Sequence, residues 1–133
     1  MARQFSTAAR NAALDAMEAA IGTSPTLELR TGAPPASCAT ADSGTVLATM
    51  ALPADWLTAA SGGVKSLSGT WQDLSADAAG TVGHFRIKQG ATCHDQGTVT
   101  ITGGGGDMTI DNPVLAVAQQ VSVTAFTLTA GGA

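Results

Sequence analysis

Four consecutive glycines, Gly103 to Gly106, run directly into Asp107, and no other stretch of the chain looks more like a site of chemistry. A Walker-type phosphate loop needs lysine and then serine or threonine after its glycines, whereas here an aspartate follows that would repel phosphate. The next residues alternate like a strand, so no helix N-terminus is available for an anion. The glycines are therefore predicted to form a β-turn or a wide hairpin loop, where glycine supplies positive φ angles.

Calcium is the alternative for this stretch, because Asp107 and Asp111 offer hard carboxylate oxygens. Residues four apart in a strand share a face but lie about 13 Å apart, and no third acid is close in sequence. We therefore expect no metal ion and no cofactor.

Zinc would need side chains from His84, His94, Cys38 and Cys93. No C-x-x-C or H-x-x-x-H spacing is present, and Cys93 and His94 are neighbours that point to opposite faces of a strand. Both histidines are expected at solvent or at an interface. Two cysteines are too few for a secreted disulfide scaffold, so free thiols are expected, with a bridge between them as the alternative.

Covalent catalysis also lacks a motif, since there is no G-x-S-x-G elbow and no cysteine at a basic helix start. No catalytic residue is assigned, and we expect a protein that is not an enzyme. Trp56 and Trp71 could stack on a sugar. In a chain with no tyrosine and three phenylalanines, they are predicted instead to anchor the core or an interface.

The first element that the sequence predicts is a helix over residues 5–21. Ser6 or Thr7 can cap it, Gly22 can end it, and its apolar side repeats through Leu14, Met17 and Ile21. The other side carries Arg10, Asn11, Asp15 and Glu18.

After Pro25 the hydrophobic pattern has period two, which predicts strands. They are expected over residues 26–31, 45–52, 65–74, 82–88, 92–102, 107–111 and 121–129, with a short segment at 55–60. The phase of the last strand reverses, which predicts a β-bulge or a change of sheet near Ala125 and Phe126. Residues 31–43 hold Pro34 and Pro35 and are predicted to form an extended loop that packs on a surface or contacts another chain.

This pattern predicts a mainly β fold, an antiparallel β-sandwich or jelly roll of about seven or eight strands with one N-terminal α-helix. We expect two parts, an amphipathic helix or arm over residues 1–24 and a β-sandwich domain over residues 25–133. Deletion of residues 1–22 is predicted to leave a folded β-body.

Composition excludes two classes of partner. The net charge is −4 and the few basic residues form no run, so nucleic acid binding is not expected. The apolar windows are much shorter than the roughly 20 residues that span a bilayer, and the N-terminal stretch lacks the apolar core of a signal peptide. A protein made and kept in a cytoplasm is expected.

The order of several segments resembles small virion proteins of tailed bacteriophages that are encoded beside the major capsid protein. These segments are the alanine-rich helix, LELRTGAPPA, GTVLATMALP, ADAAGTVGHFRI, DMTIDN and QQVSVTAFTLT, which together cover most of the chain. The resemblance implies a capsid decoration or cement protein that binds the major capsid protein lattice on the capsid exterior. Self-association as a dimer or trimer is expected, with assembly in the host cytoplasm.

Contact surfaces of such a protein would come from the helix, the proline-rich loop and the glycine tip. The interface candidates are Phe5, Leu14, Met17, Ile21, Pro34, Pro35, Trp56 and Gly104. Two alternatives remain: a tail, baseplate or head-fibre component, and a carbohydrate-binding module that uses Trp56 or Trp71.

Overall fold

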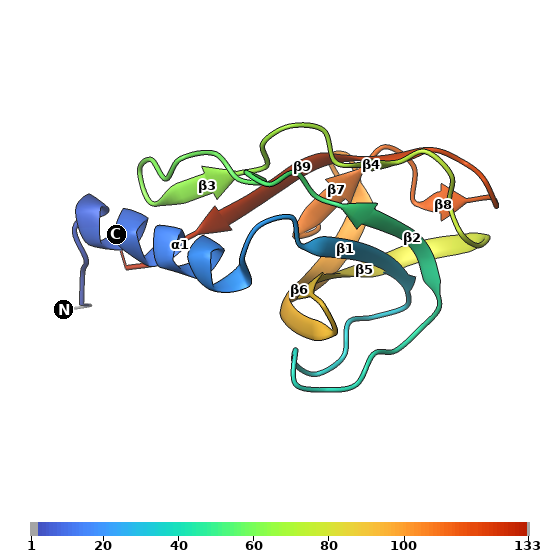
Figure 1. Ribbon diagram of the computed structural model, residues 1–133, viewed down its shortest axis with the longest axis horizontal. Helices are drawn as coiled ribbons and strands as arrows, with labels where there is room; N and C mark the ends of the chain where they lie inside the picture. The colour runs from blue at the N-terminus through green and yellow to red at the C-terminus, as the bar shows by residue number, and fades with distance from the viewer. Residues whose placement is uncertain (1–2, 133) are drawn as a thin grey trace.

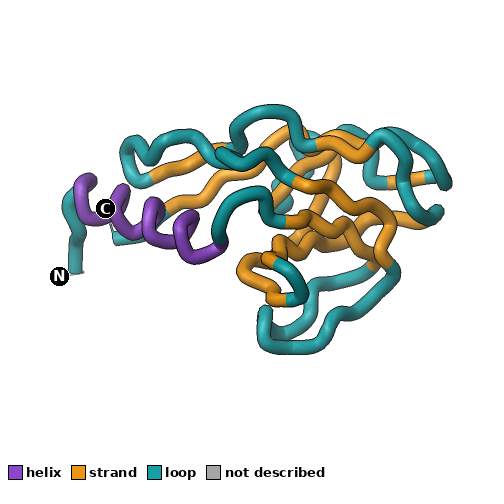
Figure 2. Tube along the Cα trace, in the orientation of Figure 1, coloured by secondary structure: helices purple, strands orange, loops and turns teal. Residues whose placement is uncertain are grey.

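The computed structural model describes residues 3–132, and in that range the protein is mainly β with one helix (Figure 1). The elements are α1 (Thr7–Ile21), β1 (Thr26–Thr31), β2 (Val46–Ala51), β3 (Val64–Ser66), β4 (Gln72–Asp73), β5 (Gly80–Gln89), β6 (Thr92–Ile101), β7 (Met108–Ile110), β8 (Val114–Leu115) and β9 (Val121–Thr129). Long loops connect several of the strands (Figure 2).

The helix ends where predicted, at Ile21, and begins at Thr7, two residues later than predicted. The Ser6 Oγ accepts a hydrogen bond of 3.1 Å from the backbone N–H of Ala9, which caps the first turn. At the other end, Gly22 adopts a φ of +94° and its N–H donates to the Glu18 carbonyl at 2.9 Å. No helix in the described part of the chain is long and apolar enough to span a lipid bilayer.

The strands form one curled mixed sheet in the order β2-β1-β5-β6-β7-β9-β3. In addition, β4 pairs with β9 and β8 pairs with β5. The two ends of the curl approach each other, because the Thr49 N–H donates to Asp73 Oδ2 at 3.0 Å and the Asp77 N–H donates to the Leu47 carbonyl at 2.8 Å. The expected β-rich class is confirmed, but the sheet is mixed because β6 and β7 run parallel.

The hydrophobic core lies inside the curl. Four aromatic rings form its centre: Trp71 lies 5.9 Å from Trp56 and 5.3 Å from Phe126, and Phe126 lies 5.6 Å from Phe85, as measured between ring centroids. Aliphatic side chains with 0% exposure surround them, namely Leu27, Leu29, Leu47, Ile87, Met108, Ile110 and Val121. The two tryptophans are therefore core residues.

Several details follow the predicted pattern. Gly90, with a φ of +61°, turns the chain between β5 and β6, which pair as an antiparallel hairpin. In β9 the register shifts so that Thr124 is the extra residue between Val123 and Ala125, a bulge one residue from the predicted site. The strand expected over residues 65–74 is interrupted and gives β3 and β4, while β8 was not predicted.

The glycine-rich segment contains the predicted β-turn, since the Gly104 N–H donates to the Ile101 carbonyl at 2.8 Å, but it does not form a hairpin. It joins β6 to β7, which are parallel, with Val99 beside Met108 and Ile101 beside Ile110. Parallel neighbours normally need a crossover of about a dozen residues or more. Here the connection is short because positive φ angles of +85° at Gly103 and +84° at Gly105 let the chain fold back along β6.

Candidate functional site

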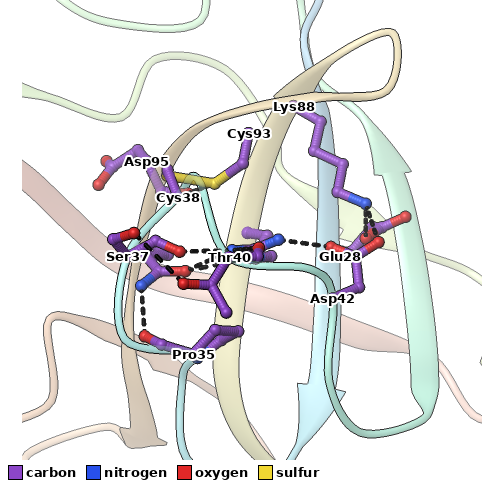
Figure 3. The surroundings of a disulfide bond; sticks show 11 residues. Glu28, Pro35, Ser37, Cys38, Thr40, Asp42, Lys88, Cys93 and Asp95 are labelled. Atoms are coloured by element: carbon purple, nitrogen blue, oxygen red, sulfur yellow. Dashed lines mark hydrogen bonds and ion pairs between the residues drawn. A yellow bond between two sulfur atoms is a disulfide. The ribbon is translucent and has the colours of Figure 1, made fainter.

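Residues 32–45, called the 32–45 loop below, lie over the outer face of β1 and β5. A disulfide between Cys38 and Cys93 ties this loop to β6, with Cα atoms 5.2 Å apart (Figure 3). The expectation of free thiols is therefore wrong. The two cysteines are 55 residues apart in sequence, and only the folding of the loop onto the sheet brings them together.

Five charged residues form an ion-pair cluster between this loop and the strands: Glu28, Arg30, Asp42, Arg86 and Lys88. Asp42 belongs to the loop and contacts all three cations, at 3.2 Å from Arg30, 2.6 Å from Arg86 and 2.6 Å from Lys88. Glu28 lies 2.9 Å from Arg30 and 3.0 Å from Lys88. The alternation in β5 correctly predicted that Arg86 and Lys88 lie on the other face of the strand from Phe85 and Ile87. That face is covered by the 32–45 loop, so both basic side chains are buried.

Arg86 also holds the loop backbone. Its guanidinium donates to the carbonyls of Ser37 at 3.0 Å and Thr40 at 2.9 Å. Gln96 accepts from Arg86 at 2.9 Å and donates to the Pro35 carbonyl at 2.7 Å. The loop is thus attached to the sheet by polar contacts and the disulfide, which confirms the expectation that it packs on a surface.

Hydrogen bonds from Lys88 and then Arg86 lower the pKa of Asp42 to about 2, although burial opposes this. The carboxylate therefore stays ionised at any physiological pH. His84 is also covered: it is 0% exposed, and its Nδ1 donates to the Gly32 carbonyl at 2.9 Å. His84 was expected at solvent or at an interface, and the prediction fails because the 32–45 loop lies on it.

The two aspartates considered for calcium binding accept hydrogen bonds from the protein instead. Asp107 accepts from the N–H and the Oγ of Thr98, and Asp111 accepts from the Ser122 N–H at 3.1 Å. Both aspartates thus cap backbone groups of the sheet. Among residues 3–132, no group of three or more His, Cys, Asp or Glu side chains is arranged to hold a metal ion.

Trp56 and Trp71 are 0% and 1% exposed, so neither ring offers a face to a sugar. The Trp56 Nε1–H donates to the Gly22 carbonyl at 3.1 Å, which joins the end of α1 to the segment between β2 and β3. The tryptophans therefore do not form the platform that a carbohydrate-binding module would use.

The helix α1 lies at one end of the molecule (Figure 1). The side that meets the body carries the buried Leu14 and Ile21 together with polar residues. Arg10 donates to the Gly62 carbonyl at 2.6 Å, and Asn11 accepts from the Gly63 N–H at 2.8 Å. The Lys65 Nζ lies 2.9 Å from Asp15 and 2.8 Å from Glu18. Burial alone would lower the pKa of Lys65, but the hydrogen bonds to these two carboxylates raise it.

The opposite side of α1 consists of alanines that face solvent: Ala8, Ala9, Ala12, Ala13, Ala16, Ala19 and Ala20 are all exposed. Phe5 and Met17 border this alanine face, with exposures of 52% and 47%. A pocket of about 370 Å³ beside Phe5 is lined by residues of α1 and of the C-terminal segment. A helix normally turns its apolar face toward the core, so an exposed apolar helix face is unusual.

The remaining interface candidates divide by exposure. Leu14, Ile21 and Trp56 are 0%, 3% and 0% exposed and pack within the chain. Pro34 and Pro35 are half-buried in the 32–45 loop. Gly104 is exposed, but a Cβ there would lie 2.7 Å from the Thr100 Oγ1 and 2.8 Å from its Cβ, so a larger residue would disturb the chain itself.

Sequence reasoning did not single out Asp42 or Asp95. Burial raises the pKa of Asp95 to about 6, against a backbone hydrogen bond from Gln96, and the nearby charge of Asp107 adds to the rise. A signal was present, because Asp95 shares its strand phase with the buried Val99 and thus points toward the inside of the curl. No protein family, curated protein or solved structure matches this chain.

Proposed function

We propose that this protein is a non-enzymatic structural component of a tailed-phage virion, a decoration or cement protein that binds the major capsid protein lattice and stabilises the head. The observation that carries the proposal is the alanine face of α1. It is exposed, uncharged and backed by a helix whose polar residues are already engaged with the sheet.

The alanine face suits close packing against another protein surface. Small side chains allow a helix backbone to approach its partner, and alanine loses no side-chain entropy when it is buried. Phe5 and Met17 at its border are 52% and 47% exposed and are the larger apolar groups available as anchors. Each contact would be modest, but many equivalent sites on a lattice let modest contacts add up.

The body of the protein also supports this role. Disulfides persist outside reducing cytoplasms, and a bridge at Cys38–Cys93 suits a protein that works on the exterior of a released particle. We infer that the curled sheet serves as the sandwich-like or jelly-roll-like body of such a protein, with α1 as the attachment arm.

The test combines copy number with variants. Purified virions from the phage that encodes this chain should contain hundreds of copies, measured by quantitative mass spectrometry, because a capsid lattice repeats its site many times. The double variant Ala12→Glu/Ala16→Glu should lower the number bound to particles by at least about tenfold, since it would bury two unpaired charges. Circular dichroism should show an unchanged fold.

The matched control is Ala79→Glu/Ala116→Glu, which adds the same charge at exposed positions next to β5 and β8, at the opposite end of the molecule from α1 (Figure 1). It should bind particles like the unmodified chain. Absence of the protein from virions, or equal loss of binding in both variants, would contradict the proposal.

A tail or baseplate component is the second candidate, because the molecule has apolar surface away from α1 as well. Leu74, Val114 and Val117 are 67%, 61% and 65% exposed. The segments that carry them are adjacent, since the Ala76 N–H donates to the Gln119 carbonyl at 2.8 Å. Two separate apolar surfaces could join copies of the chain head to tail into a ring. About six to twelve copies per virion would favour this alternative, whereas a dimer or trimer in solution fits either role.

A further inference from the structure

The strand β7 is too short to separate β6 from β9 along their full length. Its residues pair with Val99–Ile101 of β6 on one side and with residues 123–126 of β9 on the other. Residues 92–98 of β6 and 127–129 of β9 extend beyond the start of β7. Within the described chain, the first run is paired only with β5 and the second only with β3.

A pocket of about 440 Å³ lies between these two unpaired strand edges. We call it the slot; its lining residues are Phe85, Asp95, Gln96, Gly106, Asp107 and Phe126 to Thr129. If β7 were extended backwards in the same register, its residues would lie opposite Gly97 and Gln96 on β6 and opposite Leu128 and Thr129 on β9. The slot therefore stands where a further stretch of strand would complete the sheet.

Asp107 takes the place of that strand at one position only. Its Oδ2 accepts from the Thr98 N–H at 2.9 Å and from the Thr98 Oγ at 3.1 Å. Gly97 permits this approach, since a Cβ there would lie 2.7 Å from the Asp107 Oδ2. Beyond Asp107 the chain turns away, and no atom of residues 3–132 fills the rest of the slot.

The charge of the slot is negative. Asp95 and Asp107 are the ionisable residues among those that line it, and Asp95 forms no ion pair with any residue of the described chain. Asp95 pairs with Ile87 in the register of β5 and β6, so it points toward the apolar interior. A half-buried carboxylate without a cation is unfavourable, and an incoming ammonium or guanidinium group would satisfy it.

Phe85 and Phe126 contribute apolar surface to the same slot. They are 1% and 3% exposed, and their rings lie 5.6 Å apart in an edge-to-face arrangement. The aliphatic stem of a lysine or arginine can lie against such rings while its charged end reaches a carboxylate. The slot thus offers two strand edges for a backbone, an apolar surface for a stem and a carboxylate for a charge.

We propose that the slot binds an extended segment of another protein chain, which adds a short strand between β6 and β9 and places a lysine or arginine side chain beside Asp95. Main-chain hydrogen bonds would supply affinity, and the charged pair would supply specificity. The slot follows from the sheet alone, whatever particle the protein belongs to.

The test uses the full chain labelled with ¹⁵N and two blocked pentapeptides, Thr-Val-Lys-Val-Thr and Thr-Val-Glu-Val-Thr. Titration with the lysine peptide should shift the amide signals of residues 95–98 and 127–129 in a saturable way. The glutamate peptide should bind at least about tenfold more weakly, because a charge-assisted pair is replaced by a repulsive one.

Two variants separate the slot from unspecific attraction to an acidic protein. Asp95→Asn should weaken binding of the lysine peptide by about tenfold or more, whereas Asp55→Asn, the same change at an exposed acid outside the slot, should leave it unchanged. The amide spectrum of each variant reports whether it is folded. No saturable shift at residues 95–98 and 127–129, equal binding of both peptides, or equal effects of both variants would overturn the proposal.

Discussion

Asp42 and Asp95 lie close in sequence to the two ends of one disulfide, yet their surroundings are opposite (Figure 3). Asp42 touches Arg30, Arg86 and Lys88, and its pKa falls to about 2. Asp95 forms no ion pair within residues 3–132, and burial raises its pKa to about 6. An aspartate thus holds the 32–45 loop to the sheet in the ion-pair cluster, whereas an aspartate in the slot lacks an ion-pair partner among the described residues.

This difference has opposite consequences for stability. Asp42 has a lowered pKa, so its contribution is present above the usual value of 3.8 and is lost as the pH falls toward 2. Asp95 has a raised pKa, so the folded state is favoured below 3.8 and loses that advantage as the pH rises through about 6. At neutral pH, Asp42 on the outer face of the sheet therefore stabilises the fold, whereas Asp95 in the slot destabilises it.

The largest effect is expected from removal of the bridge between the two regions. The double variant Cys38→Ser/Cys93→Ser opens a loop of 55 residues, and chain entropy predicts a loss of about 4 kcal/mol of unfolding free energy. Urea denaturation of the variant and of the oxidised protein measures this value.

The same variant should affect the pKa values of the two aspartates differently. Once the 32–45 loop is no longer tied to β6, the pKa of Asp42 should rise toward 3.8, and that of Asp95 should stay near 6. Side-chain carboxyl shifts in an NMR titration follow both groups. A loss below about 1 kcal/mol with an unchanged Asp42 would show that the ion-pair cluster holds the loop without the disulfide.

The next largest effect is a gain in the free energy of unfolding. Asp95→Asn should raise the unfolding free energy at pH 7.5 by an amount on the order of 3 kcal/mol, because each pH unit between 3.8 and about 6 corresponds to about 1.4 kcal/mol. At pH 4, where Asp95 is largely protonated in the folded state, the gain should nearly vanish. Urea denaturation at both pH values measures it, with Asp55→Asn as the matched control, and an equal effect at both pH values would contradict the assignment.

The smallest effect is expected at Asp42. Its side chain is 37% exposed, so water screens the ion pairs and Asp42→Asn should lower the unfolding free energy by only about 1–2 kcal/mol at pH 7. The loss should shrink as the pH falls toward 2, which is the opposite trend to Asp95. Thermal unfolding at pH 7 and pH 2.5 distinguishes the two, and a gain in stability at pH 7 would remove the contrast between the regions.

The elements with strong local patterns could be predicted from the sequence. The cap at Ser6 and the alternation in β1 and β9 are local signals, and each gave an element with nearly the right limits. The bulge at Thr124 was visible as a reversal of hydrophobic phase. Local propensity and period were sufficient for these parts of the fold.

The features that depend on distant pairing could not be predicted. The disulfide and the ion-pair cluster exist only because the 32–45 loop folds onto β5, and no local pattern specifies where a loop of this kind will lie. The parallel pairing of β6 and β7 was missed because a short glycine-rich connection usually signals a hairpin. The slot follows from that pairing, so it was missed with it.

The attachment of α1 has a consequence for the motions of the protein. Only Leu14 and Ile21 of the helix are buried, and its other contacts with β3 and the preceding turn are hydrogen bonds and ion pairs. A segment with few buried apolar contacts opens at a lower free energy than the strands of a core. The helix should therefore exchange its amide hydrogens as a separate cooperative unit, ahead of β1 and β5, and a partner seated on its alanine face would slow that exchange without altering the sheet.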